Sequence, residues 1–473
     1  MGSTLISNGT VVNADSAIRA DVLVRDGRIV ALGIGSDWTA DHVIDATGKL
    51  VIPGGIDAHT HLEYPIDGFT TRTADDFYTG TVAAAHGGTT TILDFVKKEP
   101  DRSLYDTYLR RRDAAAQRCV VDFGLHAIVP PRDQQPDVLD DLRRLAAGAG
   151  AASWKFFMAY PGTQMVDDGE LLEGFELAAE CGALPMVHAE NGHMVARETR
   201  RLIDSGKTAE HFHATAHGHD SEAEAVHRAI VLAESVGAPL YVVHVSSAAA
   251  AEEISRARAD GRRVWAETCP QYLQVAYEDY AGLGDKAAAY LCSPPIRERS
   301  NQEGLWKALV TGAMATVATD HAGFCLHQPD DLPPQKLRSP GYFPKVPNGV
   351  PGIEDRLMVL WEGGVASGRI DPCRFVDLVS TRPAKLFGLF PRKGIVAVGA
   401  DADLVVWDPN ADHVITTAGT HMRTDYNLYD GMRVTGKPVH VLSRGDHLVD
   451  ASGSFAGAAG RGLFADRGAP NLF

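Results

Sequence analysis

The chain has 473 residues, with 45 lysines and arginines against 61 aspartates and glutamates, for a formal net charge of −16. Nucleic-acid binding needs clustered basic side chains, so this charge and the lack of any basic run exclude a nucleic-acid partner. The sequence has no apolar run of about 18 residues and no signal-peptide pattern, so no membrane partner and a cytoplasmic location are expected. The six cysteines show no Cys-x-x-Cys spacing and are expected to be reduced.

The two ends of the chain show the pattern of short antiparallel strands. Apolar and polar residues alternate in four N-terminal stretches, residues 4–7, 9–12, 20–24 and 28–33, with Asp26-Gly27 as a hairpin turn. Similar alternation returns at residues 394–398, 403–407 and 437–443. Neither end has enough strands to cover an apolar face alone, so we expect both ends to build one small β-sandwich.

Between these ends, apolar runs alternate with helix-compatible runs, which predicts parallel βαβ units. The expected strands are residues 55–62, 90–95, 121–129, 152–158, 185–190, 240–246, 263–269 and 315–320. The expected helices include residues 74–85, 104–116, 169–180, 222–236 and 248–260. Eight repeats predict an α/β fold with a (β/α)8 TIM-like barrel, whereas a doubly wound sheet is disfavoured because no G-x-G-x-x-G follows the first strand.

The resulting domain division has four parts. We expect residues 1–52 and 390–450 to form the two parts of the β-sandwich, and residues 53–389 to form the barrel. Residues 451–473 are rich in Gly and Ala, and are expected to be a tail that contacts a neighbouring subunit.

Potential metal ligands recur at the carboxyl ends of the predicted strands, where barrel enzymes place their catalytic groups. They are His59, His61, Lys155, His188, His244 and Asp320. Each alone has an ordinary explanation as a satisfied histidine or a helix cap. Because five strands of one barrel deliver them to one end, together they predict a site for two divalent ions with open coordination positions.

Lys155 is the unusual member of this set, because an ammonium group is costly to bury in the apolar run of residues 153–158. If CO2 adds to its amine, the resulting carbamate is an anion that could bridge two metals. Two dications less Asp320, the carbamate and a bridging hydroxide then leave a charge of about +1, enough to polarise a carbonyl.

Several longer motifs share one family resemblance. They are residues 55–62, 153–160, 188–191, 244–247, 267–272, 293–297, 347–349 and 353–356. With them, the sequence resembles the dihydropyrimidinase and D-hydantoinase branch of the cyclic amidohydrolases, in the amidohydrolase superfamily, essentially from end to end. The resemblance implies two Zn2+ ions, one held by His59, His61 and Asp320 and the other by His188 and His244. It also implies that carboxylated Lys155 (N6-carboxylysine) bridges both ions.

The resemblance also implies the substrate contacts and the reaction. Ser293 and Asn348 would bind the ring amides mainly through their backbones, and the Tyr160 hydroxyl would donate to the developing oxyanion. A metal-bridging hydroxide would attack the cyclic amide of a dihydropyrimidine or 5-substituted hydantoin, with Asp320 as general base and acid. The product would be an N-carbamoyl amino acid, and the enzyme would be a homotetramer.

Three other functions are the alternatives to this one. Allantoinase or another ureide hydrolase would use the same site. Dihydroorotase-like enzymes place an Arg shortly after the His-x-His, where this chain has Glu63, and a carboxylate there is expected to repel an anionic substrate. Non-catalytic scaffold relatives have lost metal ligands, whereas all six ligand positions are present here.

Two groups of residues bear on the pocket. Tyr64, Ile66, Phe69 and Phe157 would either form an apolar wall for a ring substituent or pack the surrounding loops, and both interpretations stay open. A histidine tract, His211, His213, His217 and His219, lies in a polar connection and is expected to be solvated or to cap a helix. His86 and His321 are expected to be ordinary structural histidines.

Overall fold

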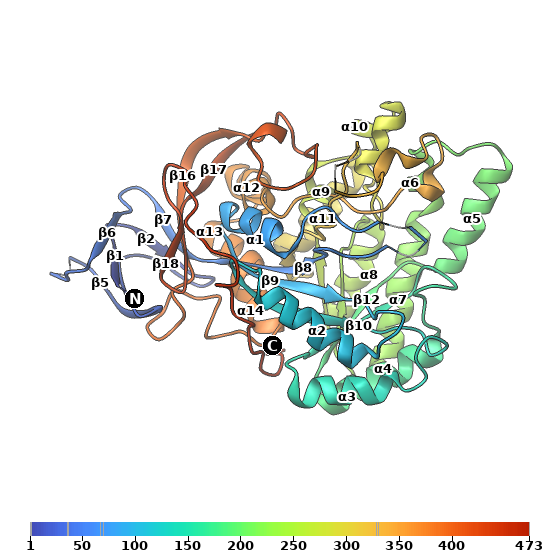
Figure 1. Cartoon of the computed structure of the whole chain (residues 1–473), viewed down its shortest axis with the longest axis horizontal. Helices are drawn as coiled ribbons and strands as arrows, with labels where there is room; N and C mark the ends of the chain where they lie inside the picture. Colours follow the sequence, from blue (N-terminus) through green and yellow to red (C-terminus); the bar gives the residue numbers. More distant parts are fainter. Residues whose placement is uncertain are drawn as a thin grey trace.

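A computed structural model describes residues 2–35, 37–66, 68–69, 71–327, 329 and 331–472. Its centre is an eight-stranded parallel sheet whose strands follow one another in chain order (Figure 1). The strands are β8 (Gly55–Thr60), β9 (Thr89–Val96), β10 (Asp122–Ile128), β11 (Ser153–Phe157), β12 (Leu184–His188), β13 (Leu240–Val242), β14 (Val264–Thr268) and β15 (Thr316–Val317). Each corresponds to one of the eight predicted strands.

The sheet curls into a barrel because its first and last strands meet. Thr60 forms a parallel bridge with His321, and the amide of His61 donates to the carbonyl of His321 at 2.9 Å. A buried apolar cluster that includes Leu93, Met186 and Tyr241 brings three barrel strands together. The predicted (β/α)8 barrel is therefore confirmed.

Helices cover the outside of the barrel and pack on the strands that follow them, as α2 does on β10 and α4 on β12. The α-helices are α1 (Phe77–His86), α2 (Leu104–Ala116), α3 (Val138–Gly148), α4 (Asp168–Cys181), α5 (Gly192–Asp204), α6 (Phe212–Ala216), α7 (His219–Ser235), α8 (Ala248–Ala259), α9 (Pro270–Gln274), α10 (Tyr277–Tyr280), α11 (Gln302–Thr311), α12 (Arg356–Trp361), α13 (Pro372–Val376) and α14 (Arg382–Leu386). Shorter 3-10 and π-helical turns are η1 (Gly284–Tyr290), η2 (Arg299–Asn301), η3 (Lys336–Arg338), η4 (Phe343–Lys345), η5 (Glu362–Ala366), η6 (Asp377–Thr381) and η7 (Thr417–Gly419).

Local sequence fixes the ends of these helices. At the start of α4, the side chain of Asp167 accepts from the amide of Glu170 at 2.8 Å, and the Glu170 side chain accepts from the amide of Asp167 at 2.7 Å. This reciprocal capping satisfies two amides that the first helical turn leaves unpaired. The helix ends at Gly182, whose φ of +67° is a conformation that glycine adopts without strain.

The two chain ends form a pair of β-sheets beside the barrel (Figure 1). The strands are β1 (Ser3–Ser7), β2 (Thr10–Val12), β3 (Ala17–Arg19), β4 (Asp21–Arg25), β5 (Arg28–Gly33), β6 (His42–Asp45), β7 (Leu50–Pro53), β16 (Leu404–Val414), β17 (Arg433–Ser443) and β18 (Asp446–Val449). One sheet has the order β5-β4-β1-β6 and the other β18-β17-β16-β7-β2-β3. Because β7 pairs with β16, both chain ends share one sheet, as predicted.

Two details of this region differ from the prediction. The N-terminal strands are not purely antiparallel, because β1 pairs in parallel with β6 and β2 with β7. Residues 394–398 form no strand; instead, the amide of Val396 donates to Oδ1 of Asn13 at 2.8 Å, and Gly394 and Gly399 both have positive φ. The Asp26-Gly27 turn between β4 and β5 is confirmed, with φ values of +49° and +78°. The domain boundaries themselves stay a prediction.

The C-terminal tail packs on the chain's own barrel. The amide of Phe123 donates to the carbonyl of Leu463 at 3.0 Å, and the amide of Ala465 donates to the carbonyl of Phe123 at 2.7 Å. Arg467 is buried and donates to Ser153 Oγ at 2.8 Å. The predicted subunit contact of this tail stays a prediction. Among the described residues, no helix combines the length and apolar character that a membrane span requires.

Candidate active site and metal centre

All six predicted metal ligands lie together at the carboxyl ends of the barrel strands. They are His59, His61, Lys155, His188, His244 and Asp320, which are from 0% to 8% exposed as whole residues. His59 lies in β8, Lys155 in β11, and His188 is the last residue of β12. The strand-end pattern in the sequence therefore located a real cluster of buried, ligand-bearing side chains.

The donor atoms form two adjoining groups. In the first, Nε2 of His59 lies 3.2 Å from Nε2 of His61, and Oδ1 of Asp320 lies 3.1 Å and 3.2 Å from these two nitrogens. In the second, Nδ1 of His188 lies 3.0 Å from Nε2 of His244. Nζ of Lys155 lies 3.0 Å from Nε2 of His59. The groups adjoin, because ligand atoms of His59, His244 and Asp320 all lie within 4.8 Å of one another.

Hydrogen bonds behind the cluster orient two of the imidazoles. Nδ1 of His59 contacts the carboxylate of Glu267, and Nε2 of His188 lies 2.8 Å from Oε2 of Glu190. A neutral imidazole that donates one N–H to a carboxylate turns the lone pair of its other nitrogen toward the cluster, which is the arrangement of metal-binding histidines. The lone pairs of His59 and of the Asp320 carboxylate then face each other and repel unless a cation lies between them. The donor set therefore fits bound divalent cations.

Burial governs the protonation of the cluster. It lowers the pKa of His59, His61 and His244 well below the usual value, so these rings are neutral and each has a lone pair that can bind a metal. Burial also lowers the pKa of Lys155 to about 8, although Asp320 and Glu267 oppose the shift. The interior thus stabilises the Lys155 ammonium poorly.

No role is predicted from the sequence for two carboxylates of this network, Glu267 and Glu190. Glu267 is fully buried, and besides His59 it accepts from the Tyr241 hydroxyl at 2.8 Å and from the amide of His244 at 3.2 Å. Burial raises the pKa of Glu267 to about 8. Glu190 is also fully buried; burial raises its pKa, but His217 and His188 outweigh that effect and the pKa lies well below the usual value. The sequence could have indicated both residues, because Glu267 and Glu190 lie at the ends of β14 and β12, where the predicted ligands also lie.

Three predicted site residues have left-handed backbone conformations. The φ angles are +65° at Tyr160, +39° at His244 and +50° at Asp320. Such angles are unfavourable for residues with a side chain and are held by the surrounding structure. Beside Asp320, the Thr319 hydroxyl donates to Asp57 at 2.6 Å, and Nε2 of His321 lies 3.2 Å from Oδ2 of Asp75. His321 thus has the structural role expected of it.

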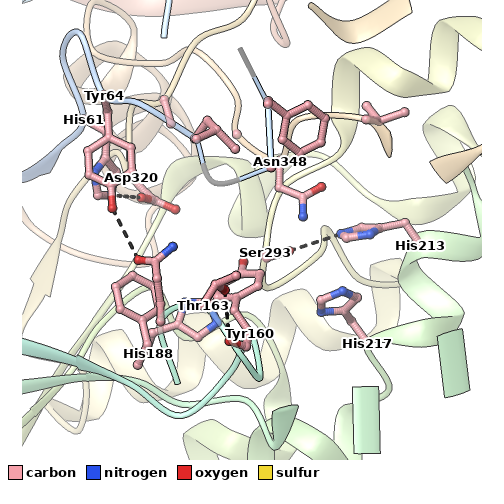
Figure 2. Close-up of a pocket in the computed structure, with 18 of the residues that line it drawn as sticks. His61, Tyr64, Tyr160, Thr163, His188, His213, His217, Ser293, Asp320 and Asn348 are labelled. Carbon is pink, nitrogen blue, oxygen red and sulfur yellow. Dashed lines mark hydrogen bonds and ion pairs between the residues drawn. The ribbon is translucent and has the colours of Figure 1, made fainter. Parts of the chain in front are cut away.

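A cavity of about 370 Å³ opens onto the cluster. Tyr160, Ser293 and Asn348 line it, as the resemblance implied (Figure 2). Neither the amide nor the carbonyl of Ser293, nor the amide of Asn348, has a hydrogen-bond partner among the described residues. Burial raises the pKa of the Tyr160 hydroxyl, and Glu190 adds to the shift, so Tyr160 is a neutral hydrogen-bond donor.

The cavity has an apolar side. Tyr64, Ile66, Phe69 and Phe157 all line it, which favours the wall over the packing interpretation. Phe343, Pro344 and Val346 add further apolar lining that the sequence did not reveal, because they lie in and directly after the short turn η4, where the sequence has no strand or helix periodicity.

The expectation for the histidine tract was wrong for two of its members. His213 and His217 are 3% and 6% exposed and line the cavity, across from His61 and Tyr64 (Figure 2). Nε2 of His213 lies 2.8 Å from the carbonyl of Cys292, and Nδ1 of His217 lies 2.8 Å from Oε1 of Glu190. The polar neighbours in the sequence had predicted that water surrounds these histidines, whereas buried polar groups of the protein take the place of that water. His219 does lie near the surface, beside Glu298.

The expected role of Glu63 was also wrong. Its carboxylate binds Arg118, with Nη1 to Oε1 at 2.7 Å, and Glu63 is not among the described residues that line the cavity. A paired carboxylate outside the pocket cannot repel a substrate inside it.

A barrel whose strand ends gather four histidines, a lysine and an aspartate beside a cavity defines a metal-dependent hydrolase. Residues 50–448 match the amidohydrolase family. The chain is 46% identical over 466 residues to a D-hydantoinase of Geobacillus stearothermophilus, covering 98% of this chain and 96% of the relative. It is 43% identical over 469 residues to a D-hydantoinase of Streptomyces coelicolor, covering 98% of each. The crystal structure of a dihydropyrimidinase from Brevibacillus agri superposes with a TM-score of 0.94 at 42% identity, covering 99% of each chain. The chain therefore belongs to the amidohydrolase family.

Proposed function

We propose that the protein hydrolyses the cyclic amide bond of dihydropyrimidines and 5-substituted hydantoins to give N-carbamoyl amino acids. The observation that carries the proposal is the position of the ligand cluster beside a cavity lined by Ser293 and Asn348, whose peptide amides have no hydrogen-bond partner among the described residues. A cyclic ureide has N–H and C=O groups side by side, which such peptide groups can pair with. The names of the similar proteins support the same reaction.

In this proposal His59, His61 and Asp320 would hold one divalent ion, and His188 and His244 would hold the other. We assign Zn2+ as the metal and propose that Lys155, whose Nζ lies in the cluster at 3.0 Å from Nε2 of His59, would be carboxylated and serve as a ligand shared by both ions. Bound metals would supply a water of lowered pKa and would polarise the substrate carbonyl.

The protein's own groups then move the proton and stabilise the charge. Asp320, whose Oδ1 lies at the edge of the cluster, accepts the proton of the attacking water. It passes that proton to the ring nitrogen, because an amide anion is too poor a leaving group to depart unprotonated. Tyr160 donates its hydroxyl hydrogen to the oxyanion that forms at the carbonyl. Ser293 and Asn348 hold the ring through their backbone groups.

The apolar wall favours one substrate class. Ile66, Phe69 and Phe157 would contact an apolar substituent at the ring, whereas the ureido substituent of allantoin would be desolvated there without a partner. We therefore favour 5-alkyl and 5-aryl hydantoins over allantoin. The homotetramer and the cytoplasmic location stay predictions.

The test compares kcat/KM for dihydrouracil, hydantoin, a 5-aryl hydantoin and allantoin on protein of measured metal content. We expect turnover of the first three and the highest kcat/KM for the substituted hydantoin. Preferred turnover of allantoin would overturn the assignment in favour of a ureide hydrolase, and no turnover by metal-loaded protein would support a non-catalytic relative.

A further inference from the structure

Lys336 is a buried lysine outside the metal cluster. It begins η3 and is 0% exposed, and among the described residues no carboxylate forms an ion pair with it. Its Nζ instead donates to two backbone carbonyls, those of Leu291 and Pro347, each at 2.8 Å. Burial lowers its pKa to about 7. A polar group buried this completely is costly unless hydrogen bonds satisfy it, and the two carbonyls supply those bonds.

The two carbonyls belong to the two segments that line the cavity. Pro347 shares a peptide unit with the amide of Asn348, and a planar trans peptide points its C=O and N–H in opposite directions. A Pro347 carbonyl held toward Lys336 therefore turns the Asn348 amide away from Lys336. Leu291 lies two residues before Ser293, and its carbonyl also accepts from the amide of Gly349 at 2.9 Å.

The Asn348 segment is also tightly seated. Gly349 has a φ of +146°, and a Cβ at this position would lie 2.4 Å from the carbonyl oxygen of Ala322. Glycine is therefore required at Gly349, and the chain there has little room to shift. This segment is joined to the one at Ser293 by the direct hydrogen bond from the Gly349 amide to the Leu291 carbonyl, and the Lys336 amine adds a second link through the carbonyls of Leu291 and Pro347.

We propose that Lys336 is a positioning residue that holds the segments of Ser293 and Asn348 in register, so that their backbone groups meet the substrate ring together. Lys336 touches neither the substrate nor a metal ligand; it acts through the two peptide carbonyls. The inference rests on the proposed function, because it assumes that these backbone groups bind the ring amides. Ring contacts made in both the ground and transition states affect KM more than kcat.

The first experiment measures KM and kcat for hydantoin in Lys336→Met, which keeps most of the unbranched side chain and removes its donors. Two ring hydrogen bonds that lose alignment should raise KM about 10- to 100-fold. We expect kcat to change less than about 3-fold and the metal content to stay at the wild-type value. The matched control is Lys345→Met, the same substitution at an exposed lysine three residues before Asn348, which should leave KM unchanged.

Lys336→Arg guards against a folding defect, because its guanidinium still offers donors to both carbonyls and should restore KM to within about 5-fold of wild type. An unchanged KM in Lys336→Met would overturn the proposal. So would a fall in kcat and melting temperature at constant KM, because a merely structural lysine would lower the active fraction alone.

The second experiment does not depend on turnover. Hydrogen exchange should be faster in Lys336→Met than in wild type for peptides covering residues 289–296 and 347–351, and unchanged in Lys345→Met. Wild-type protein that hydrolyses no cyclic amide would refute the proposed function and leave this measurement intact. Unchanged exchange in both peptides would refute the positioning role even in an active enzyme.

Discussion

Replacing Tyr160 with phenylalanine removes one hydroxyl from the cavity and leaves the ring in place. The ring packs beside Phe157 and His188, with centroids 5.9 Å and 5.5 Å away, so the substitution should not disturb the wall. The hydroxyl is the group proposed to donate to the oxyanion. Its loss should therefore act on the transition state more than on the bound substrate.

The magnitude follows from the environment of the hydroxyl. A donor aimed at an oxyanion in a water-excluded site is worth about 3–4 kcal/mol, which is roughly 100- to 1000-fold in kcat. Because burial raises the pKa of Tyr160, the hydroxyl stays protonated through neutral and mildly alkaline pH, and the loss should be independent of pH there. KM should change by less than about 3-fold.

The assay is steady-state hydrolysis of hydantoin from pH 6 to pH 9 on protein of matched metal content. Tyr64→Phe is the control, because Tyr64 lines the same cavity and its hydroxyl lies 3.5 Å from Oε1 of Gln164. We expect it to change kcat by less than about 3-fold, since no developing charge is assigned to that hydroxyl. Equal losses in the two variants, or a kcat of Tyr160→Phe near wild type, would refute the oxyanion role.

Three further substitutions test other parts of the molecule. Asp320→Asn should abolish turnover while metal analysis finds most of the metal retained; full activity would exclude Asp320 as the proton carrier. Lys155→Ala should lose metal and activity together and be partly rescued by a short carboxylic acid, whereas undiminished metal content would contradict a bridging role. Asp355 is buried, and burial, with Glu354 adding to it, raises its pKa from 3.8 to about 7. The folded state thus holds this proton more tightly than the unfolded state, so stability falls as pH rises through this range. In wild type, the free energy of unfolding should fall between pH 5 and pH 8, and Asp355→Asn should make this fall smaller by about 2–3 kcal/mol, as measured by urea unfolding. If the free energy of unfolding had the same pH dependence in the two proteins, the prediction would be wrong.

The barrel could be predicted because each of its strands is buried on both faces and bounded by polar residues. Strands such as β9 and β10 are apolar runs between turn signals, and that pattern is local in the sequence. The parallel pairing of β2 with β7 could not be predicted, since it joins strands separated by two hairpins and leaves no trace in the periodicity of either. Residues 394–398 show the converse case: their alternating pattern is real, but Asn13 takes the hydrogen bond that a strand partner would need.

The ligand set was predictable for a geometric reason, because parallel strands deliver their carboxyl ends to one face. Groups that reach the site from loops carried no such signal. His217 was expected to be solvated because its neighbours in the sequence are polar. Its polar partner is instead the buried Glu190, which follows β12. Lys336 lies in a loop segment, and only the folded chain shows that its amine joins two stretches of the cavity wall.

The lining of the cavity, rather than Glu63, disfavours an anionic substrate. Glu63 cannot provide it, because Arg118 neutralises that carboxylate outside the pocket. Among the described lining residues, however, the only lysine or arginine is Lys155, which lies in the metal cluster. A substrate carboxylate would have to be desolvated without the bidentate arginine that such groups usually bind. His217 does not replace that arginine, because its Nδ1 is bound to the Glu190 carboxylate, whose negative charge would lie behind any anion placed there. Outside the metal cluster, the described lining residues therefore offer no lysine or arginine for an anion, and this lack, rather than a repelling carboxylate, favours neutral rings.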